Sequence, residues 1–226
     1  MPFPTRPFRW PGLGAALCLA FLLLSQPLLA ADKSVLAIVS DRSAPTLVAG
    51  AHELLSARKG QVIHIRSVSQ LAEMDDRQLQ ALIAEHQAVL MIAVFGEPVE
   101  RLLNMPYPQG QARMVLHSDR RLLPLQHDRN GSIFAKDIPE AIVSEKAALS
   151  GTDELSRLKA AQPRHADWLQ ARAYWVNRSV DNAASLLDLV ASGGVRQKPV
   201  TLVPAVRTAL HDKGGVRWMD AAEPGR

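Results

Sequence analysis

The sequence predicts an α/β protein in which a three-layer unit built on a parallel sheet is followed by a mainly helical C-terminal part. Short, continuous apolar runs recur between residues 34 and 117, as is typical of strands buried on both faces of a parallel sheet. Segments with apolar residues at helical spacing separate these runs. After residue 121 the pattern changes to longer helical stretches, which predicts the C-terminal part.

The α/β unit is predicted element by element from this alternation. Strands are predicted at residues 34–40, 61–66, 88–95 and 113–117. Helices are predicted from Asp41 or Ser43 to Gly60, from Leu71 to His86, and from Val99 to Leu103. Because each helix carries the chain from one strand to the next, we expect parallel strands with helices on both faces. This order is typical of flavodoxin-like and periplasmic-binding-protein-like units.

The elements of the C-terminal part are less regular. Asp128–Gly131 has the composition of a tight turn between short apolar stretches. Helices are predicted at residues 137–149, 151–160 and 167–190, the last with a break near Asn177 and an end at Gly193. A short strand is predicted at residues 200–203. The predicted domain plan is a signal peptide at 1–30, the α/β unit at 31–121, a hairpin plus helical segment packed on it at 122–212, and a frayed tail at 213–226.

The N-terminal residues have the order of a secretory signal peptide. Arg6 and Arg9 form a positive region, residues 13–24 form an apolar core, and small residues offer a cleavage site after Ala30. An apolar core of this length falls short of the roughly 20 residues that a bilayer requires. We therefore expect an exported, periplasmic protein, whose membrane attachment would come only from an uncleaved signal. The single cysteine, Cys18, lies in this segment, so no disulfide or thiolate site is expected in the mature chain.

The net charge of +4 is partly a property of that segment. Residues 1–30 hold Arg6 and Arg9 and no acidic residue, so the formal charge of the rest falls to +2. No run of lysine or arginine follows, and a surface that tracks phosphates needs clustered cations. We therefore expect no nucleic-acid partner.

Candidate ligand-binding residues follow the predicted strands. Ligands of open parallel sheets bind outside the carboxyl ends of the strands. Those ends carry polar side chains that suit a divalent metal or a polar ligand: Ser40, Asp41, Glu97, His117 and Asp119. The alternative is that these residues are helix caps and solvated loop ends. No glycine-rich phosphate loop, nucleophile elbow or His-Glu-x-x-His motif is present, so no ATP site and no catalytic residue are predicted.

The last long helical segment holds a second set of candidates. Asn177 and Asn182 are either part of a helix break with a fresh cap or a ligand-facing patch. Its aromatic residues are expected in the core, with stacking on a flat macrocycle as the alternative: Trp168, Tyr174 and Trp175. The seven histidines are dispersed without zinc-motif spacing, and His64, in an apolar strand, is expected to be a core histidine.

Four segments resemble a known family. Residues 34–41, residues 88–97 with the ending Val-Phe-Gly-Glu, and residues 117–121 look like the N-terminal region of the cobaltochelatase large subunit (CobN type), a relative of the magnesium-chelatase H subunit. Residues 173–187 are similar to a family stretch in which an aromatic pair precedes Asn-Gly-Gly-x-Glu-Asn. Here Arg178 and Ser179 replace the two glycines and Asp181 replaces the glutamate.

The resemblance implies a role with tetrapyrroles and metals. Family members insert cobalt or magnesium into a tetrapyrrole while separate subunits hydrolyse ATP, and their chains are much longer than this one. The first hypothesis is therefore an exported CobN-like module that handles a metal, corrinoid or related tetrapyrrole, such as cobalamin, without catalysis of its own. The alternatives are a piece of a split chelatase and a periplasmic binding protein for a small solute. The expected partners are a larger chelatase subunit or an envelope transport partner, with cobalt or another divalent metal as the metal.

Overall fold

The computed structural model describes residues 34–132, 152–202, 208–212 and 215–219, and the predicted signal peptide lies outside them. Within the described residues, the main sheet has six strands in the order β2-β1-β3-β4-β5-β6. Its strands are β1 (Val35–Val39), β2 (Ile63–Ser67), β3 (Ala88–Ile92), β4 (Ala112–Leu116), β5 (His127–Asp128) and β6 (Gly131–Ser132). The pairs β1–β2, β1–β3 and β3–β4 are parallel, whereas β5 and β6 pair antiparallel. The predicted parallel α/β sheet is confirmed.

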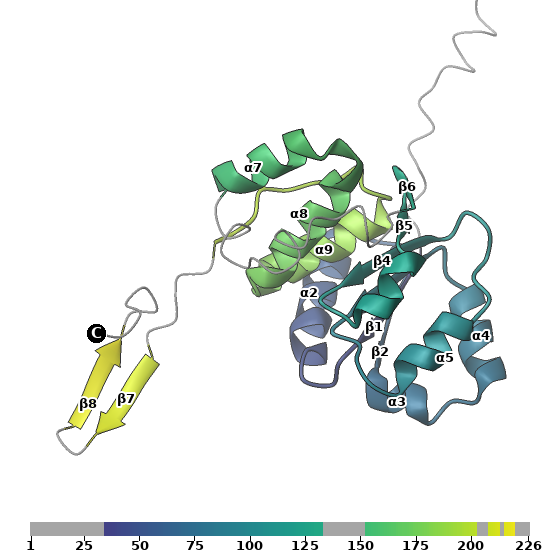
Figure 1. The fold of residues 1–226 in the computed structure, drawn as a ribbon, viewed down its shortest axis with the longest axis horizontal. Coiled ribbons are helices and arrows are strands. Elements are labelled where there is room, and N and C mark those ends of the chain that lie inside the picture. The colour runs from purple at the N-terminus through teal and green to yellow at the C-terminus, as the bar shows by residue number, and fades with distance from the viewer. Residues whose placement is uncertain (1–33, 133–151, 203–207, 213–214, 220–226) are drawn as a thin grey trace, which may run out of the picture. The chain divides into compact units, whose positions relative to one another are not determined.

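Helices cover both faces of this sheet (Figure 1). One face carries α2 (Ala44–Ala57), α8 (Ala166–Val176) and α9 (Val180–Ala191), with α7 (Thr152–Ala161) and the 3₁₀ helix η4 (Pro163–His165) beyond them. The other face carries α3 (Val68–Ala72), α4 (Asp76–Ala84), α5 (Pro98–Asn104) and the 3₁₀ helix η1 (Arg120–Leu125). The three layers and the helical C-terminal part agree with the predicted fold class.

Two hydrophobic cores lie on the two faces of the sheet. Every residue of β1 is buried, and alternate side chains enter opposite cores because the side chains of a strand point alternately to its two faces. Val35, Ala37 and Val39 join the core with α2, α8 and α9. Leu36 and Ile38 join the core with α3, α4 and α5. The C-terminal helices therefore share one core with the sheet.

The closest helix contact in that core is between α2 and α9. Gly50 of α2 is buried, and a Cβ atom built there would lie 2.5 Å from the Cβ of Ala183 and 2.7 Å from the backbone nitrogen of Ala184. These distances are shorter than any ordinary van der Waals contact, so the approach of the two helices depends on the missing side chain.

The predicted break in the last long helix is confirmed. Helix α8 ends at Val176, and Ser179 caps α9 by accepting a hydrogen bond from the backbone nitrogen of Asn182. At its other end, α9 ends at Ala191, and Gly193 and Gly194, which follow its cap Ser192, have φ values of 62° and 88°. Their N–H groups donate to the carbonyls of Val190 and Leu189, respectively, at 3.0 and 2.8 Å, which is a complete Schellman motif.

Two predictions in the α/β unit are wrong in extent. The helix predicted from Leu71 to His86 is two helices, because Asp75 caps α4 in a reciprocal pair with Gln78 and so starts a new helix. The strand predicted at residues 88–95 ends at Ile92, because Ala93 has a φ of 53°, which no strand residue adopts.

Two predictions near the C-terminus also need correction. Residues 200–202 form no strand, because the backbone of Thr201 is bonded to the side-chain amide of Asn182 in place of a neighbouring strand. Within the predicted frayed tail, β8 (Gly215–Met219) pairs with β7 (Thr208–Asp212). The helix predicted at residues 137–149 lies outside the described residues.

The substitution Gly50→Ala tests the contact between α2 and α9. Alanine improves the intrinsic helix propensity by roughly 1 kcal/mol. The new methyl group nevertheless meets α9 backbone atoms that cannot swing aside, and such overpacking costs about 1–3 kcal/mol. We expect a net loss of stability in chemical denaturation. Glu53→Ala, at an exposed position of the same helix, is the control and should change the stability by less than about 0.5 kcal/mol. A more stable Gly50→Ala chain would contradict the close approach.

Candidate functional site

The carboxyl edge of the parallel strands is the first place to look for a ligand. The strand order places β2 and β3 on opposite sides of β1, so the connections after β1 and β3 leave the sheet in different directions. Ligands of open parallel sheets commonly bind at such a switch point, outside the carboxyl ends of the strands. Ser40 and Asp41 follow β1, residues 93–97 follow β3, and residues 117–119 follow β4. The structure thus brings five of the predicted residues to one edge.

The segments after β3 and β4 stay bonded to each other beyond the sheet. The N–H of Ala93 donates to the carbonyl of Leu116 at 3.1 Å, and the N–H of Val94 donates to the hydroxyl of Ser118 at 3.1 Å. The N–H of Asp119 donates to the carbonyl of Val94 at 2.9 Å. These bonds hold the two loop starts side by side and give the edge a defined shape.

Both segments contain backbone that is unusual for their residue types. Ala93 and His117 have φ values of 53° and 47°, and they are the non-glycine residues with positive φ among those that the structure describes. Holding such a conformation costs on the order of 1 kcal/mol or more, and it persists only where the surrounding structure enforces it. The hydrogen bonds described above supply that enforcement.

An exposed aromatic side chain and an imidazole lie together at this edge. Phe95 is 52% exposed, and its ring centroid lies 6.1 Å from that of His117 with the two rings nearly perpendicular, at 87°. The sequence predicted Phe95 as the last residue of a buried strand. It is exposed because the strand ends at Ile92 and the chain turns at Ala93.

Two carboxylates at the edge, Asp41 and Asp119, have local partners. Asp119 caps η1 and accepts two hydrogen bonds from the guanidinium of Arg121, which lowers the pKa of the Asp119 carboxyl to about 2. The hydroxyls of Ser67 and Ser69 lower the pKa of Asp41. Glu97 is exposed and does not cap α5 with its side chain. Asp119 therefore serves as a helix cap, as the alternative interpretation expected.

The candidates on the C-terminal helices are buried within the fold. The amide of Asn182 donates to the carbonyls of Asn177 and Thr201 and accepts from the N–H of Thr201. The amide of Asn177 donates to the carbonyl of Ala173 at 3.0 Å. The expected core position of the aromatic residues is confirmed, since each is at most 3% exposed: Trp168, Tyr174 and Trp175. Asn177 and Asn182 thus use their amides to join α8, α9 and residue 201.

The prediction for His64 is wrong. It is exposed on the edge strand β2 and forms a hydrogen bond with the buried His86, with 2.8 Å between the two ring nitrogens. Periodicity could not find this pair, because the two histidines are far apart in the sequence and meet only through the sheet. Among the described residues, no group of three or more metal-ligating side chains is close enough to hold an ion.

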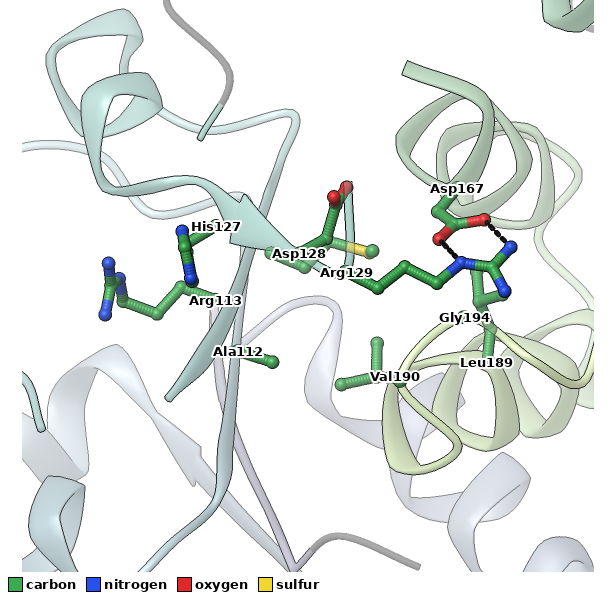
Figure 2. Close-up of a pocket in the computed structure, with 11 residues that line it drawn as sticks. Ala112, Arg113, His127, Asp128, Arg129, Asp167, Leu189, Val190 and Gly194 are labelled. Carbon is green, nitrogen blue, oxygen red and sulfur yellow. Dashed lines mark hydrogen bonds and ion pairs between the residues drawn. The ribbon is translucent and has the colours of Figure 1, made fainter. Parts of the chain in front are cut away.

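A pocket between the β4–β5 ribbon and the C-terminal helices is the second candidate (Figure 2). It is small, with about 20 Å³ of internal space, which is enough for about one water molecule. Asp167, which is fully buried, lies at its wall and accepts two hydrogen bonds from Arg129, at 2.7 and 2.9 Å. Asn130 and Gln197 also donate to this carboxylate, at 3.3 and 2.7 Å.

This pocket is too small for a macrocycle. Its charged residues Asp167 and Arg129 are hydrogen-bonded to each other. Gly194 packs directly against Asp167, because a Cβ atom there would lie 2.2 Å from a carboxylate oxygen. Burial raises the pKa of Asp128, another wall residue. The arrangement ties the turn of the β5–β6 hairpin to α8 and to the segment after α9, and its role is structural.

The comparisons with known proteins add no family. A scan against protein-family models found no match, and a search among curated proteins found none either. Within the described residues, the longest apolar helices fall short of what a membrane crossing requires.

Removing the Arg121 guanidinium tests the electrostatics of the edge. In Arg121→Ala, the pKa of Asp119 should rise from about 2 toward the ordinary 3.8 without reaching it, because the backbone N–H of residue 121 still donates to the carboxylate. The stability that the folded protein gains from this pair is fully present above pH 3.8, the ordinary pKa of the carboxyl, and is lost as the pH falls through about 2. Carboxyl ¹³C NMR titration measures the value. Lys59→Ala, which removes an exposed charge beyond the far end of α2, should leave it unchanged, and a midpoint still near 2 in Arg121→Ala would contradict this account.

Asp167→Asn tests the structural role of the buried carboxylate. Breaking a buried ion pair costs about 3–5 kcal/mol, and we expect about 2 kcal/mol here, because the side chain of Arg129 is 46% exposed and water takes over part of its solvation. Chemical denaturation measures the loss. Asp153→Asn, an exposed residue of α7, should change the stability by less than about 0.5 kcal/mol. Equal stabilities of the two variants would argue against the tie.

Proposed function

We propose that this chain is an exported module that binds a metal-bearing tetrapyrrole, a corrinoid by preference, at the carboxyl edge of its sheet, and that it catalyses no reaction by itself. The observation that carries the proposal is the pairing of Phe95 and His117 at that edge. A half-exposed aromatic ring offers stacking area to a flat conjugated ligand. An imidazole nitrogen is a good ligand for the metals that tetrapyrroles carry.

The geometry of the two rings supports a common ligand. A tetrapyrrole already holds its metal through four nitrogens, so His117 alone would be enough to hold the metal from the protein side. The ring of Phe95, which is nearly perpendicular to that imidazole, would then stack on the conjugated macrocycle. The angle of 87° between Phe95 and His117 is compatible with this arrangement.

The neighbouring polar groups suit the rim of such a ligand. The metal, when bound, supplies a Lewis-acidic centre, and the chain's own groups orient the macrocycle. The carboxylate of Glu97 is able to accept hydrogen bonds from amide substituents, and the hydroxyl of Ser40 is able to donate to carboxylate substituents or accept from amides. Asp41 and Asp119 are held as carboxylates by serine and arginine partners and shape the loops.

The sequence resemblance points the same way. The segments that resemble the CobN-type cobaltochelatase subunit include the ends of β1, β3 and β4, which form the proposed site. A larger chelatase subunit or an envelope transport partner would receive the ligand. The predicted signal peptide would place this exchange in the periplasm.

Titration with diaquocobinamide, a cobalt corrinoid with open axial positions, tests the proposal. We expect the full chain to bind one equivalent, with a change in the visible spectrum that reports coordination by a nitrogen. His117→Gln should abolish the spectral change, and Phe95→Ala should weaken binding about two- to tenfold, the value of one lost aromatic contact. His52→Gln, at an exposed position of α2, is the matched control and should bind like the wild type.

Two outcomes would contradict the proposal. One is the absence of saturable binding of cobinamide, hydrogenobyrinate or cobalamin by calorimetry. The other is an unchanged spectral response in His117→Gln, which would place any corrinoid elsewhere on the chain.

A further inference from the structure

The opposite edge of the sheet carries a pair of histidines that the proposed function does not use. His64 is the second residue of β2, and His86 precedes β3 by two residues. Parallel strands begin at the same edge, so both residues lie at the amino ends of the strands, away from Phe95 and His117. The two rings meet edge to face, with centroids 4.8 Å apart.

The ring of His86 is fixed by its surroundings. His86 is only 4% exposed, and its Nδ1 lies 2.7 Å from the carbonyl oxygen of Leu82. A carbonyl oxygen only accepts, so Nδ1 carries a proton and donates it. In the neutral ring, Nε2 therefore holds a lone pair. The backbone carbonyl of His86 is also held, by the side-chain amide of Gln111 at 2.7 Å.

That lone pair points at the second imidazole. Nε2 of His86 lies 2.8 Å from Nδ1 of His64, which donates its proton in the neutral pair. If the proton moves from Nδ1 to Nε2 of His64 through solvent, the ring stays neutral and both facing nitrogens present lone pairs. The point between them is then a two-nitrogen site for a cation.

We propose that His64 and His86 bind a divalent transition-metal ion in place of the shared proton. Zinc–imidazole bonds of about 2.0–2.1 Å place two nitrogens roughly 3.3 Å apart in a tetrahedral site, so the rings need to separate by about half an ångström. His64 is exposed and is able to move that far. The hydrogen bond from Nδ1 of His86 to a backbone carbonyl is the outer contact that commonly orients a metal-binding histidine.

The chemistry of the pair selects the kind of ion. Imidazole suits zinc, copper and nickel, whereas magnesium and calcium prefer oxygen ligands. Two protein ligands leave the other positions to water, so the ion is held in an exchangeable way. This inference does not depend on the tetrapyrrole proposal, since it uses other residues at the other edge.

Titration of the full chain with Zn²⁺ at neutral pH tests the site. We expect one equivalent bound at the pair, with Mg²⁺ at the same concentration giving no heat. Imidazole ¹⁵N NMR should show the largest shifts at Nδ1 of His64 and Nε2 of His86, which a purely structural hydrogen bond would not show on addition of metal. His64→Gln should weaken Zn²⁺ binding at least tenfold, and the matched control His52→Gln should leave it unchanged.

The same measurements can overturn the inference. Equal Zn²⁺ affinity in His64→Gln and the wild type would do so. Ring signals of His64 and His86 that stay in place while Zn²⁺ binds would also do so, and this readout on the wild type holds whether or not the variant folds.

Discussion

Gly50 lets α2 and α9 approach each other more closely than any side chain would allow, and much of the structure depends on that contact. Helix α2 follows the first strand, whereas α9 comes near the end of the described chain. Their contact brings the C-terminal helices onto the sheet face, where α8 and α9 complete a core that includes β1, β3 and β4. A sheet with apolar residues on both faces needs helices on both. The C-terminal helices therefore belong, with α2, to the helical layer that covers one face of the sheet.

Buried ion pairs also hold the helices of this layer in place. Asp167, buried in α8, is paired with Arg129 in the hairpin turn, and Asp188 of α9 is paired with Arg58 after α2 and with Arg196. A buried carboxylate is tolerated only where partners replace its water, so these pairs specify which segments meet.

With one face fixed in this way, the two edges of the sheet carry the groups on which the two proposals rest. The carboxyl edge presents Phe95 and His117 on loop starts that are bonded to each other. The amino edge presents His64 beside the buried and oriented His86. At the carboxyl edge the bonded loop starts hold the backbone of both residues, and at the amino edge the oriented ring of His86 holds His64. Such order would reduce the cost of binding the proposed ligands.

The sequence by itself determined the alternation of strands and helices and hence the parallel sheet, because buried strands and amphipathic helices leave period-dependent apolar patterns. It also placed the break near Asn177 and the stop at Gly193, and it assigned Ser40, Asp41, Glu97, His117 and Asp119 to one edge of the sheet, although the strand before Glu97 ends at Ile92 and not at Phe95. Local hydrogen bonds decided the caps at Asp75 and Ser179, which periodicity could not find. The turn at Ala93 that exposes Phe95 is held by bonds to the segment after β4, so the tertiary structure decided it. Only the tertiary structure decided that Asn177 and Asn182 face inward and that His64 meets His86, because these contacts join residues that no local pattern relates.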